Sequence, residues 1–453
     1  MKKGSYLDNV RIQYENYPYP SRDPEAEKGV LLTSKSASLD CLNYYCFEGK
    51  RDLTKTFRVL VPGGGTGDCT IYLAEQLRGT EAEVVYLDMS ASSMAVAQQR
   101  AAIRQLDNIT WIHDSILNLP NLNIGKFDFI TCTGVLHHLS DPSQGLDALK
   151  SVLDDDGSIY LMLYATYGRT GVYQMQELLK RFNAGVDDMD IKIENTKKIL
   201  GQLPDTNWFS FNRSSFSVGH DSDIYDLLLH TQDRAYTVPE LYDYVEAGGL
   251  HVNKLYNPDN DLGDMLFQPE TFIADPQLLD TVRSYAYRER AAICELLFGQ
   301  LKKQSCFISF KEKTPPSFED LDLVPDLSVS FSRQSGQLRS AFLSDQKQIK
   351  LNALITITRT EHTAAIWRAL DGLRSTREII ELVIKEAAKP VTFNKVYREF
   401  ESLFGVMVQV SAMYLRSSKV PKYHAISELE LRMHPIYGVE ECLKERENYI
   451  ATH

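Results

Sequence analysis

The sequence predicts an α/β protein whose main part is a doubly wound, mostly parallel seven-stranded sheet with helices on both faces. Three observations predict this fold class. Short apolar runs alternate with helical segments between residues 56 and 165, a glycine-rich turn follows the first run, and two further strand-like runs occur much later. Near-continuous apolar strands separated by helices are typical of a parallel sheet that is covered on both faces. The 453 residues also leave room for a smaller second domain.

The first strands and helices follow one another in a regular order. A helix is expected directly after the glycine-rich turn of residues 62–67, and Ser90 can cap the helix after the second strand. We expect strands at residues 57–61, 83–87, 109–112, 127–131 and 158–163.

Beyond residue 165 the pattern becomes mostly helical. A capping-box spacing between Thr237 and Glu240 predicts one helix that leads into a late strand. Two late strands, at residues 250–252 and 305–310, would complete the sheet. Helical insertions are expected over residues 170–235 and 257–302.

A second unit follows the proline-rich, acidic stretch of residues 314–327. Its helical patterns near residues 364–370, 376–384 and 393–404 precede strand-like runs at 406–410 and 413–415. Helices followed by a small hairpin predict a winged-helix-like α+β domain. We therefore expect an N-terminal arm over residues 1–50, the main domain over 51–313 and the smaller domain over 328–453.

Composition narrows the partners and the location. The 49 basic and 61 acidic residues give a net charge of −12, and no long Lys/Arg run occurs, so a duplex nucleic acid partner is not expected. The seven cysteines form no CxxC pair, which favours reduced thiols and neither disulfides nor a metal site. The start has no apolar signal region, and no apolar stretch approaches the roughly 18 residues that span a bilayer. We expect a cytoplasmic protein without a membrane partner.

The glycine-rich turn and an acidic residue predict a nucleoside-type ligand. Gly63, Gly65 and Gly67 lie between a strand and a helix, where the absence of side chains lets a ligand approach the backbone. Asp88 ends the second strand, 21 positions after Gly67, and its carboxylate can accept both hydroxyls of a ribose. These features favour an adenosine-type ligand over a plain turn, and both NAD and S-adenosylmethionine satisfy them.

Five segments in succession narrow this choice. VLVPGGGTGDCT, YLDMS, HDSILNLP, FDFITCTGVLHHLSDP and DDDGSIYLMLY resemble the successive motifs of the class I (seven-β-strand, Rossmann-like) S-adenosylmethionine-dependent methyltransferases. The resemblance covers residues 57–165, and the later TVPEL…AGGLHV segment resembles the last helix and sixth strand of that family. It implies a methyltransferase that uses S-adenosyl-L-methionine and releases S-adenosyl-L-homocysteine.

The resemblance also implies roles for single residues. The glycines match the loop around the methionine part of the cofactor, Asp88 matches the ribose-binding acid, and an acid–serine pair matches the adenine edge. The chain departs from the family at Val61, where an acid usually stands two residues before the first glycine. The matching positions are Gly63, Gly65, Gly67, Asp88, Met89, Asp114, Ser115, Thr133 and Val135.

The N-terminal segment of residues 14–24 interleaves tyrosines with prolines. Proline stiffens such a segment and presents its aromatic rings in fixed directions. We interpret it as a lid over the methyl-transfer cleft, where aromatic faces shelter the sulfonium. Tyr14 and Arg22 would then contact the cofactor, and Tyr19 would contact the reacting groups. The alternative is an arm that packs on the outside of the domain.

Two polar groups are candidates for catalysis and acceptor binding. His137, the first of two adjacent histidines, could act as a base near the methyl group, or could be a packing residue. His230, Asp233, Arg234 and Tyr236 precede the sixth-strand unit and could bind a polar acceptor. Their alternative role is a salt-bridged loop that leads to a helix cap.

The C-terminal segment WRALDGLRSTREI bears on the substrate. It resembles the signature of small winged-helix peptide-recognition modules, and a similar tail follows some bacterial protein lysine methyltransferases. The alternative is a packing or dimerisation appendage, which leaves a homodimer open. The first hypothesis is methyl transfer to a protein or peptide side chain. The second is N- or O-methylation of a small metabolite, and the third is a catalytically silent cofactor-binding scaffold.

Overall fold

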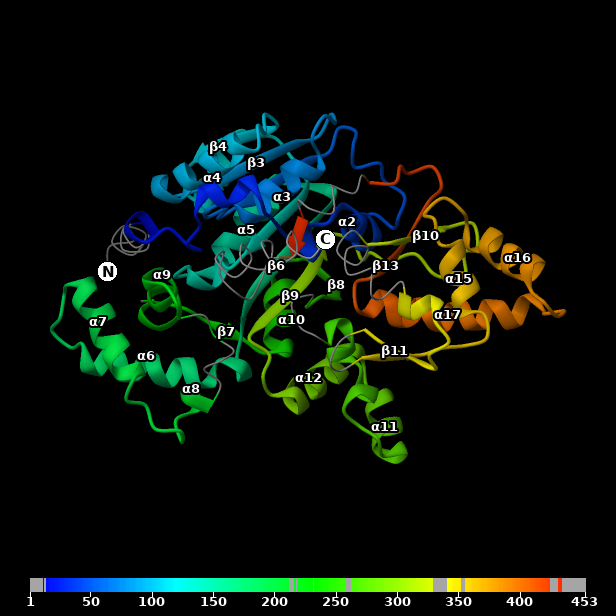
Figure 1. The fold of residues 1–453 in the computed structure, drawn as a ribbon. Helices are drawn as coiled ribbons and strands as arrows, with labels where there is room; N and C mark the ends of the chain where they lie inside the picture. The colour runs from blue at the N-terminus through cyan, green and yellow to red at the C-terminus, as the bar shows by residue number, and fades with distance from the viewer. Residues whose placement is uncertain are drawn as a thin grey trace.

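A mixed sheet of eight strands forms the centre of the protein (Figure 1). Its strands are β2 (Arg58–Pro62), β3 (Glu83–Asp88), β4 (Ile109–His113), β5 (Phe127–Thr133), β6 (Leu153–Ala165), β7 (Ala235–Tyr236), β8 (His251–Leu255) and β9 (Lys303–Ser309). The computed structural model describes residues 11, 14–211, 216, 218–230, 232–257, 262–328, 340–351, 355–423 and 431–433. The sheet confirms the predicted α/β fold class, with the two-residue strand β7 as an eighth strand beside the seven that were expected.

The strand order is β4-β3-β2-β5-β6-β9-β8, and the short β7 pairs with β6. All pairings are parallel except those of β9, which is antiparallel to β6 and β8. The chain order reverses between β2 and β5, with β3 and β4 on one side and β6 on the other. In open α/β sheets a ligand binds at such a reversal, beyond the carboxyl ends of the strands.

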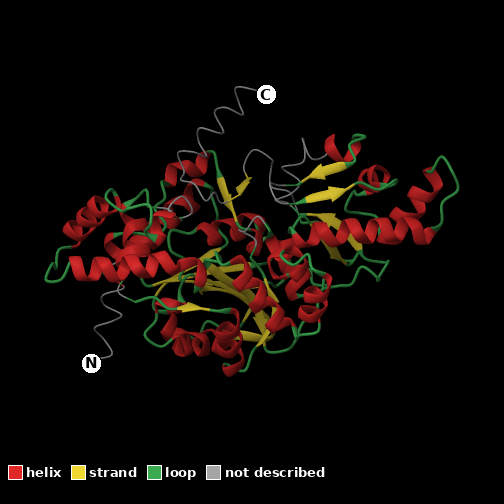
Figure 2. Cartoon of the chain, turned by 90° about the horizontal axis from the view of Figure 1, so that it is seen from below, coloured by secondary structure: helices red, strands yellow, loops and turns green. Residues whose placement is uncertain are grey.

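Helices cover both faces of the sheet, as Figure 2 shows. The neighbouring residues Val59 and Leu60 belong to different buried clusters because successive side chains of a strand point to opposite faces. The helices between the first strands are α3 (Asp68–Gln76), α4 (Ala91–Ile103) and α5 (Pro142–Val152), and α10 (Val238–Ala247) packs beside β7, β8 and β9.

The two expected insertions are mostly helical. The one after β6 contains α6 (Thr170–Phe182), α7 (Met189–Leu200), α8 (Trp208–Phe211), α9 (Asp221–Ile224) and the π-helical turn η7 (Tyr225–Leu229). The second contains the 3-10 turns η8 (Gly263–Phe267) and η9 (Pro269–Thr271), and the helices α11 (Pro276–Arg283) and α12 (Tyr287–Phe298).

The N-terminal fifty residues have two parts. Residues 14–28 pack against the turn after β2 and against α4, and they end in the 3-10 turn η1 (Pro24–Lys28). The following residues are core, because Leu31, Leu39 and Leu42 are at most 2% exposed. Their elements are β1 (Leu31–Thr33), which pairs in parallel with β14 (Leu431–Met433), the turn η2 (Lys35–Ala37) and α2 (Leu39–Cys46).

The C-terminal region contains the three predicted helices and two small antiparallel strand pairs. Its elements are β10 (Val324–Leu327), β11 (Gln348–Lys350), β12 (Thr356–Thr358), α15 (Thr363–Ala369), α16 (Thr376–Glu386), α17 (Phe393–Gln409) and β13 (Met413–Arg416). The strand predicted over residues 406–410 is wrong. Helix α17 continues to Gln409 because Met407 extends its buried stripe of Val396, Phe400 and Leu403, and this packing outweighs the β-branched composition.

The C-terminal region shares its core with the main sheet. Strand β13 pairs with β10, which lies inside the stretch expected to be a linker. One buried cluster contains Phe307 of β9, Leu42 of α2 and Phe400 of α17. Removing residues 328–453 would therefore expose part of the core of the main domain.

Two further expectations concern the cysteines and the membrane. The six cysteines in the described ranges are free, and Cys442 lies outside these ranges. Among the helices of the described residues, none is long and apolar enough to cross a bilayer.

Candidate active site

The glycine-rich turn lies between β2 and α3, at the reversal of the strand order. Gly63, Gly65 and Gly67 have φ angles of +70°, +52° and +99°, which favour glycine. A Cβ atom on Gly63 would lie 2.3 Å from Cγ2 of Val135, and one on Gly65 would lie 2.6 Å from the carbonyl oxygen of Tyr19. Close approach from two other segments therefore also requires glycine at these positions.

Asp88 is held beside this turn by two backbone hydrogen bonds. Its Oδ2 accepts from the N–H of Gly65 and its Oδ1 from the N–H of Ser90, each across 2.8 Å. The side chain is buried, and this burial raises the pKa of the Asp88 carboxyl above its ordinary value, although the backbone hydrogen bonds oppose the rise. The structure thus brings together the turn and the acid that the sequence singled out.

The other expected cofactor contacts lie at the ends of the adjacent strands. The N–H of Asp114 donates to the carbonyl oxygen of Asp88, and its carboxylate accepts from the N–H of Ser115 across 2.7 Å. The carbonyl oxygen of Met89 lies 3.1 Å from Nε2 of His113. Thr133 ends β5 with an exposed side chain.

The segment of residues 14–20 lies against the glycine turn and the start of α4. Thr66 donates its hydroxyl to the carbonyl oxygen of Pro20 across 2.7 Å, and Ser90 donates to that of Tyr14 across 2.9 Å. The carboxylate of Glu15 accepts from the first N–H groups of α4, at Ala91 and Ser92. A carboxylate there is stabilised by the free N–H groups and by the helix dipole. This docking is what a lid over the turn requires.

Arg22 does not point freely toward a cofactor. Its guanidinium donates to both carboxylate oxygens of Asp68, the first residue of α3, at 2.9 Å and 2.7 Å. Asp68 also accepts from Nη1 of Arg100, which in turn donates to the carbonyl oxygen of Thr66. Arg22 therefore acts on the turn through Asp68.

Four rings pack together beyond the carboxyl ends of β5 and β6, and we call His137, His138, Tyr164 and His230 the ring cluster. His137 stacks on Tyr164 with a centroid distance of 3.8 Å, and His138 stacks on His230 at 3.9 Å. Arg169 lies 3.6 Å from the centroid of the Tyr164 ring. The cluster places His137 and His230, which are far apart in sequence, in one site.

The histidines of the ring cluster are neutral at pH 7. Burial lowers the pKa of His138 to about 4 and that of His230 to about 3, and it lowers the pKa of His137 well below its ordinary value. Both ring nitrogens of His137 and Nε2 of His230 are buried without a hydrogen-bond partner in the described part of the chain.

The remaining expected acceptor residues form a loop beside the ring cluster. Asp233 is buried in an ion pair with Arg169 at 2.9 Å. The N–H of Arg234 donates to the carbonyl oxygen of His137, and its guanidinium lies 4.9 Å from the ring centroid of Tyr236. These contacts agree with the salt-bridged loop and also keep the loop next to the site.

Sequence reasoning missed Asp226 of η7. This carboxylate is 5% exposed and accepts from the hydroxyls of Tyr14 and Tyr164. Burial raises its pKa, and burial also raises the pKa of the Tyr19 phenol, with the charge of Asp226 as the second cause. The available signal was a single acid inside the apolar run Ile-Tyr-Asp-Leu-Leu-Leu of residues 224–229.

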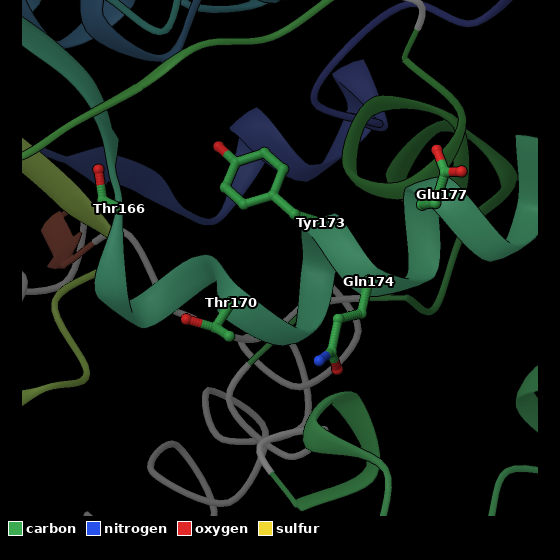
Figure 3. Close-up of a pocket in the computed structure, with 5 residues that line it drawn as sticks. All are labelled: Thr166, Thr170, Tyr173, Gln174 and Glu177. Atoms are coloured by element: carbon green, nitrogen blue, oxygen red, sulfur yellow. The ribbon is translucent and has the colours of Figure 1, made fainter.

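A pocket of about 550 Å³ lies along α6, next to the ring cluster. It is lined by Thr166, which follows the end of β6, and by four residues in the first turns of α6, namely Thr170, Tyr173, Gln174 and Glu177 (Figure 3). Nε of Arg169 donates to the hydroxyl of Tyr173 across 3.3 Å, so one wall of the pocket contacts the residue that covers Tyr164.

Comparison with known sequences gives matches to methyltransferases. A family model described as a methyltransferase domain matches residues 60–159, the segment from the glycine turn to β6. An uncharacterised protein from Synechococcus sp. is 33% identical over 312 residues, which are 67% of this chain and 72% of that protein. A ubiquinone biosynthesis O-methyltransferase from Glaesserella parasuis is 32% identical over 117 residues, 25% of this chain and 46% of that enzyme, so the match spans less than half of its length.

A solved structure shares the fold over most of the chain. PKMT2 from Rickettsia typhi in complex with AdoHcy is similar with a TM-score of 0.61 and 15% sequence identity. The similarity covers 85% of this chain and 77% of that one. It therefore extends beyond the residues that the family model matches and includes part of the insertions or of the C-terminal region.

Proposed function

The chain belongs to the class I S-adenosylmethionine-dependent methyltransferases, and from this premise we propose that its methyl acceptor is a side chain of a protein or peptide. The observation that carries this proposal is the pocket along α6, which lies at the surface beside the buried ring cluster. Such a position suits a side chain that projects from a large acceptor.

The glycine turn and Asp88 fit the cofactor. The turn packs against Val135 and Tyr19 too closely for a Cβ atom, and a buried carboxylate stands next to it at the end of β3. Asp88 accepts the ribose hydroxyls, Gly63, Gly65 and Gly67 lie around the methionine part, and Asp114 with Ser115 meets the adenine edge. The bound cofactor supplies an activated methyl group, so the protein has mainly to align the acceptor and exclude water. The docked arm, with Tyr14 and Tyr19, performs the second task.

Two features support a protein or peptide as the acceptor. The fold similarity to PKMT2 extends over 85% of the chain. In the C-terminal region, the turn after α15 presents Leu373 with 72% of its side chain exposed, and Asp371 fixes this turn by accepting from the N–H groups of Leu373 and Arg374. This turn lies in the segment that resembles a peptide-recognition module, and we propose that it contacts the acceptor protein.

A small metabolite is the second candidate acceptor. It is favoured by the similarity to a ubiquinone biosynthesis O-methyltransferase, which covers 25% of this chain and 46% of that enzyme.

The test is to incubate the protein with tritiated S-adenosylmethionine and a bacterial extract. Ultrafiltration first separates the extract into a retained fraction of macromolecules and a filtrate of small molecules. We expect label in acid-precipitable protein from the retained fraction, and no label in protein when Gly65→Val replaces the wild type. Label that appears only in small molecules of the filtrate would overturn the proposal in favour of the second candidate.

A further inference from the structure

We propose that Asp226, with the rings of Tyr14 and Tyr164, is the binding site for a protonated amine, and that the methyl acceptor is the nitrogen of this amine. The inference rests on the proposed function and deepens it, since it names the acceptor group. A lysine-type side chain, with an ammonium at the end of a flexible alkyl stem, is the chemistry that this site would take.

The first observation is the geometry of the carboxylate. Oδ1 of Asp226 accepts from the hydroxyl of Tyr14 across 3.1 Å, and Oδ2 accepts from that of Tyr164 across 3.2 Å. The carboxylate is therefore held from two sides by residues 212 and 62 positions away. The ring of Tyr17 stacks on that of Tyr225, next to Asp226, at 5.5 Å, which fixes the arm on η7.

The second observation concerns charge. Asp226 has no ion-pair partner among the described residues, although it is 5% exposed. The charge of Arg169 acts on Asp226, but Arg169 is already paired with Asp233 in a bridge whose side chains are 4% and 1% exposed. A buried carboxylate that only hydroxyls contact is costly unless a cation joins it. An ammonium would supply the charge, and tyrosine faces would stabilise it further.

The third observation is a free acceptor atom. Both ring nitrogens of His137 lack partners within the described ranges, and the side chain is fully buried. Because His137 is neutral, one of its nitrogens can accept a hydrogen bond, whereas Nδ1 of His230 already accepts from the N–H of Gln232. An ammonium has three donors and no acceptor, so it matches a site that combines a carboxylate with the accepting nitrogen of His137.

Burial raises the pKa of Asp226, which suits it to the proton transfer that the reaction needs. Asp226 takes one proton from the ammonium and leaves a neutral amine. The nitrogen lone pair then bonds to the methyl carbon, while the carbon–sulfur bond breaks and its electrons stay on sulfur. The methylated nitrogen carries the positive charge away, and Asp226 returns its proton to water.

Helix α6 packs beside this site. Nε2 of Gln176 donates to the carbonyl oxygen of Leu227 across 3.0 Å, so α6 packs directly on the turn that carries Asp226. The pocket lined by Tyr173 and Glu177 lies on the same helix. Tyr173 contacts Arg169, which lies over the ring of Tyr164, the tyrosine that donates to Asp226.

The first experiment measures binding without turnover. Isothermal titration with n-butylammonium, in the presence of saturating S-adenosylhomocysteine, is compared with titration by butan-1-ol. We expect at least tenfold tighter binding of the cation, and we expect Asp226→Asn to remove this preference. Asp221→Asn is the matched control, because Asp221 is one turn away, half exposed and paired with Lys197. Equal affinities for the cation and the alcohol in the wild type would overturn the inference.

A second experiment keeps the inference testable where Asp226→Asn does not fold. N-acetylated peptide libraries with a fixed central Lys, Gln, Glu or Cys are offered to the wild type with tritiated S-adenosylmethionine. Label only in the Lys library supports the inference. Label only in another library overturns it and leaves the proposed function intact. If no peptide or protein is labelled but the preference for the cation still depends on Asp226, the proposal of a protein or peptide acceptor is overturned. The inference of an amine site at Asp226 then stands, and the acceptor is a free amine.

Discussion

The N–H of Gly65 donates a hydrogen bond to Oδ2 of Asp88 across 2.8 Å. This bond joins the turn after β2 to the end of β3, so the two parts of the expected cofactor site are connected before a ligand binds. The hydroxyl of Tyr86 also donates to the carbonyl oxygen of Gly65, across 2.8 Å. Changes in Asp88 therefore act on the shape of the turn as well as on the ribose.

Asp88→Ala is expected to weaken S-adenosylhomocysteine binding by about 1.5–3 kcal/mol, the range for hydrogen bonds to a charged group. The loss has two sources, because the variant removes the ribose acceptor and releases the N–H groups of Gly65 and Ser90. Isothermal titration measures it, with Asp107→Ala, an exposed acid in the loop before β4 at the opposite edge of the sheet, as the control. Unchanged affinity of the Asp88 variant would place the cofactor elsewhere.

Gly65→Val is expected to abolish cofactor binding and to displace the arm, because the new Cβ would lie 2.6 Å from the carbonyl oxygen of Tyr19. Gly79→Val is the matched control. Gly79 also has a positive φ, +70°, but nothing lies within 4 Å of a Cβ atom there, so it reports the backbone strain alone. Binding by titration and folding by circular dichroism are measured for both. Normal affinity in a folded Gly65→Val variant would contradict the placement of the cofactor at this turn.

Removal of residues 1–24 is expected to reduce turnover more than tenfold, a loss of at least about 1.4 kcal/mol in transition-state stabilisation. The truncation deletes the contacts of the arm with Thr66, Ser90 and Asp226 and opens the site to water. The core should stay folded, since the sheet begins at Arg58. If the truncated protein binds cofactor and turns over normally, the arm only packs on the domain.

Arg22→Ala is expected to weaken cofactor binding indirectly, because it leaves Asp68, at the start of α3, with Arg100 as its remaining arginine partner. Lys28→Ala is the control, since Lys28 forms an exposed pair with Glu25 in the same segment. Titration with S-adenosylhomocysteine should distinguish the two variants. Equal affinities would show that the Arg22–Asp68 pair serves the arm and not the cofactor.

Glu295→Gln is expected to change the pH dependence of stability. Burial raises the pKa of Glu295 to about 7 from an ordinary value of 4.5, although the carboxylate accepts from the N–H of Val238 and from Nε2 of Gln304. Between these two pH values the folded state binds more protons than the unfolded state, so the stability of the wild type falls as the pH rises.

The free energy of unfolding of the wild type relative to Glu295→Gln should therefore decrease from pH 5 to pH 8, by on the order of 1–3 kcal/mol. The variant can keep its contacts, because Oε1 of Gln304 has no partner within the described structure and can accept from the new amide after a flip. Urea denaturation at both pH values measures the difference. A wild type and variant with parallel pH profiles would show that Glu295 stays ionised.

The local pattern of the sequence determined the order of the strands and helices and the position of the glycine turn. Apolar periodicity and turn residues depend on near neighbours, so β2, β3, β5 and β6 and the capping box of Thr237 and Glu240 were predictable. The family motifs likewise narrowed the candidate cofactor residues to a few positions. The strand predicted over residues 406–410 was wrong for a physical reason. Its β-branched residues continue helix α17 because the buried stripe of that helix continues through Met407.

Only the tertiary structure decided which of these residues meet. Arg22 pairs with Asp68 instead of extending toward a ligand, because the arm folds back on the start of α3. Tyr14 and Asp226 are 212 positions apart, and their hydrogen bond depends on the packing of the arm on η7. Contacts at such separations leave no periodic signal in the sequence. For that reason a single acid in an apolar run gave no sign of its aromatic partners until the fold brought them to the end of β6.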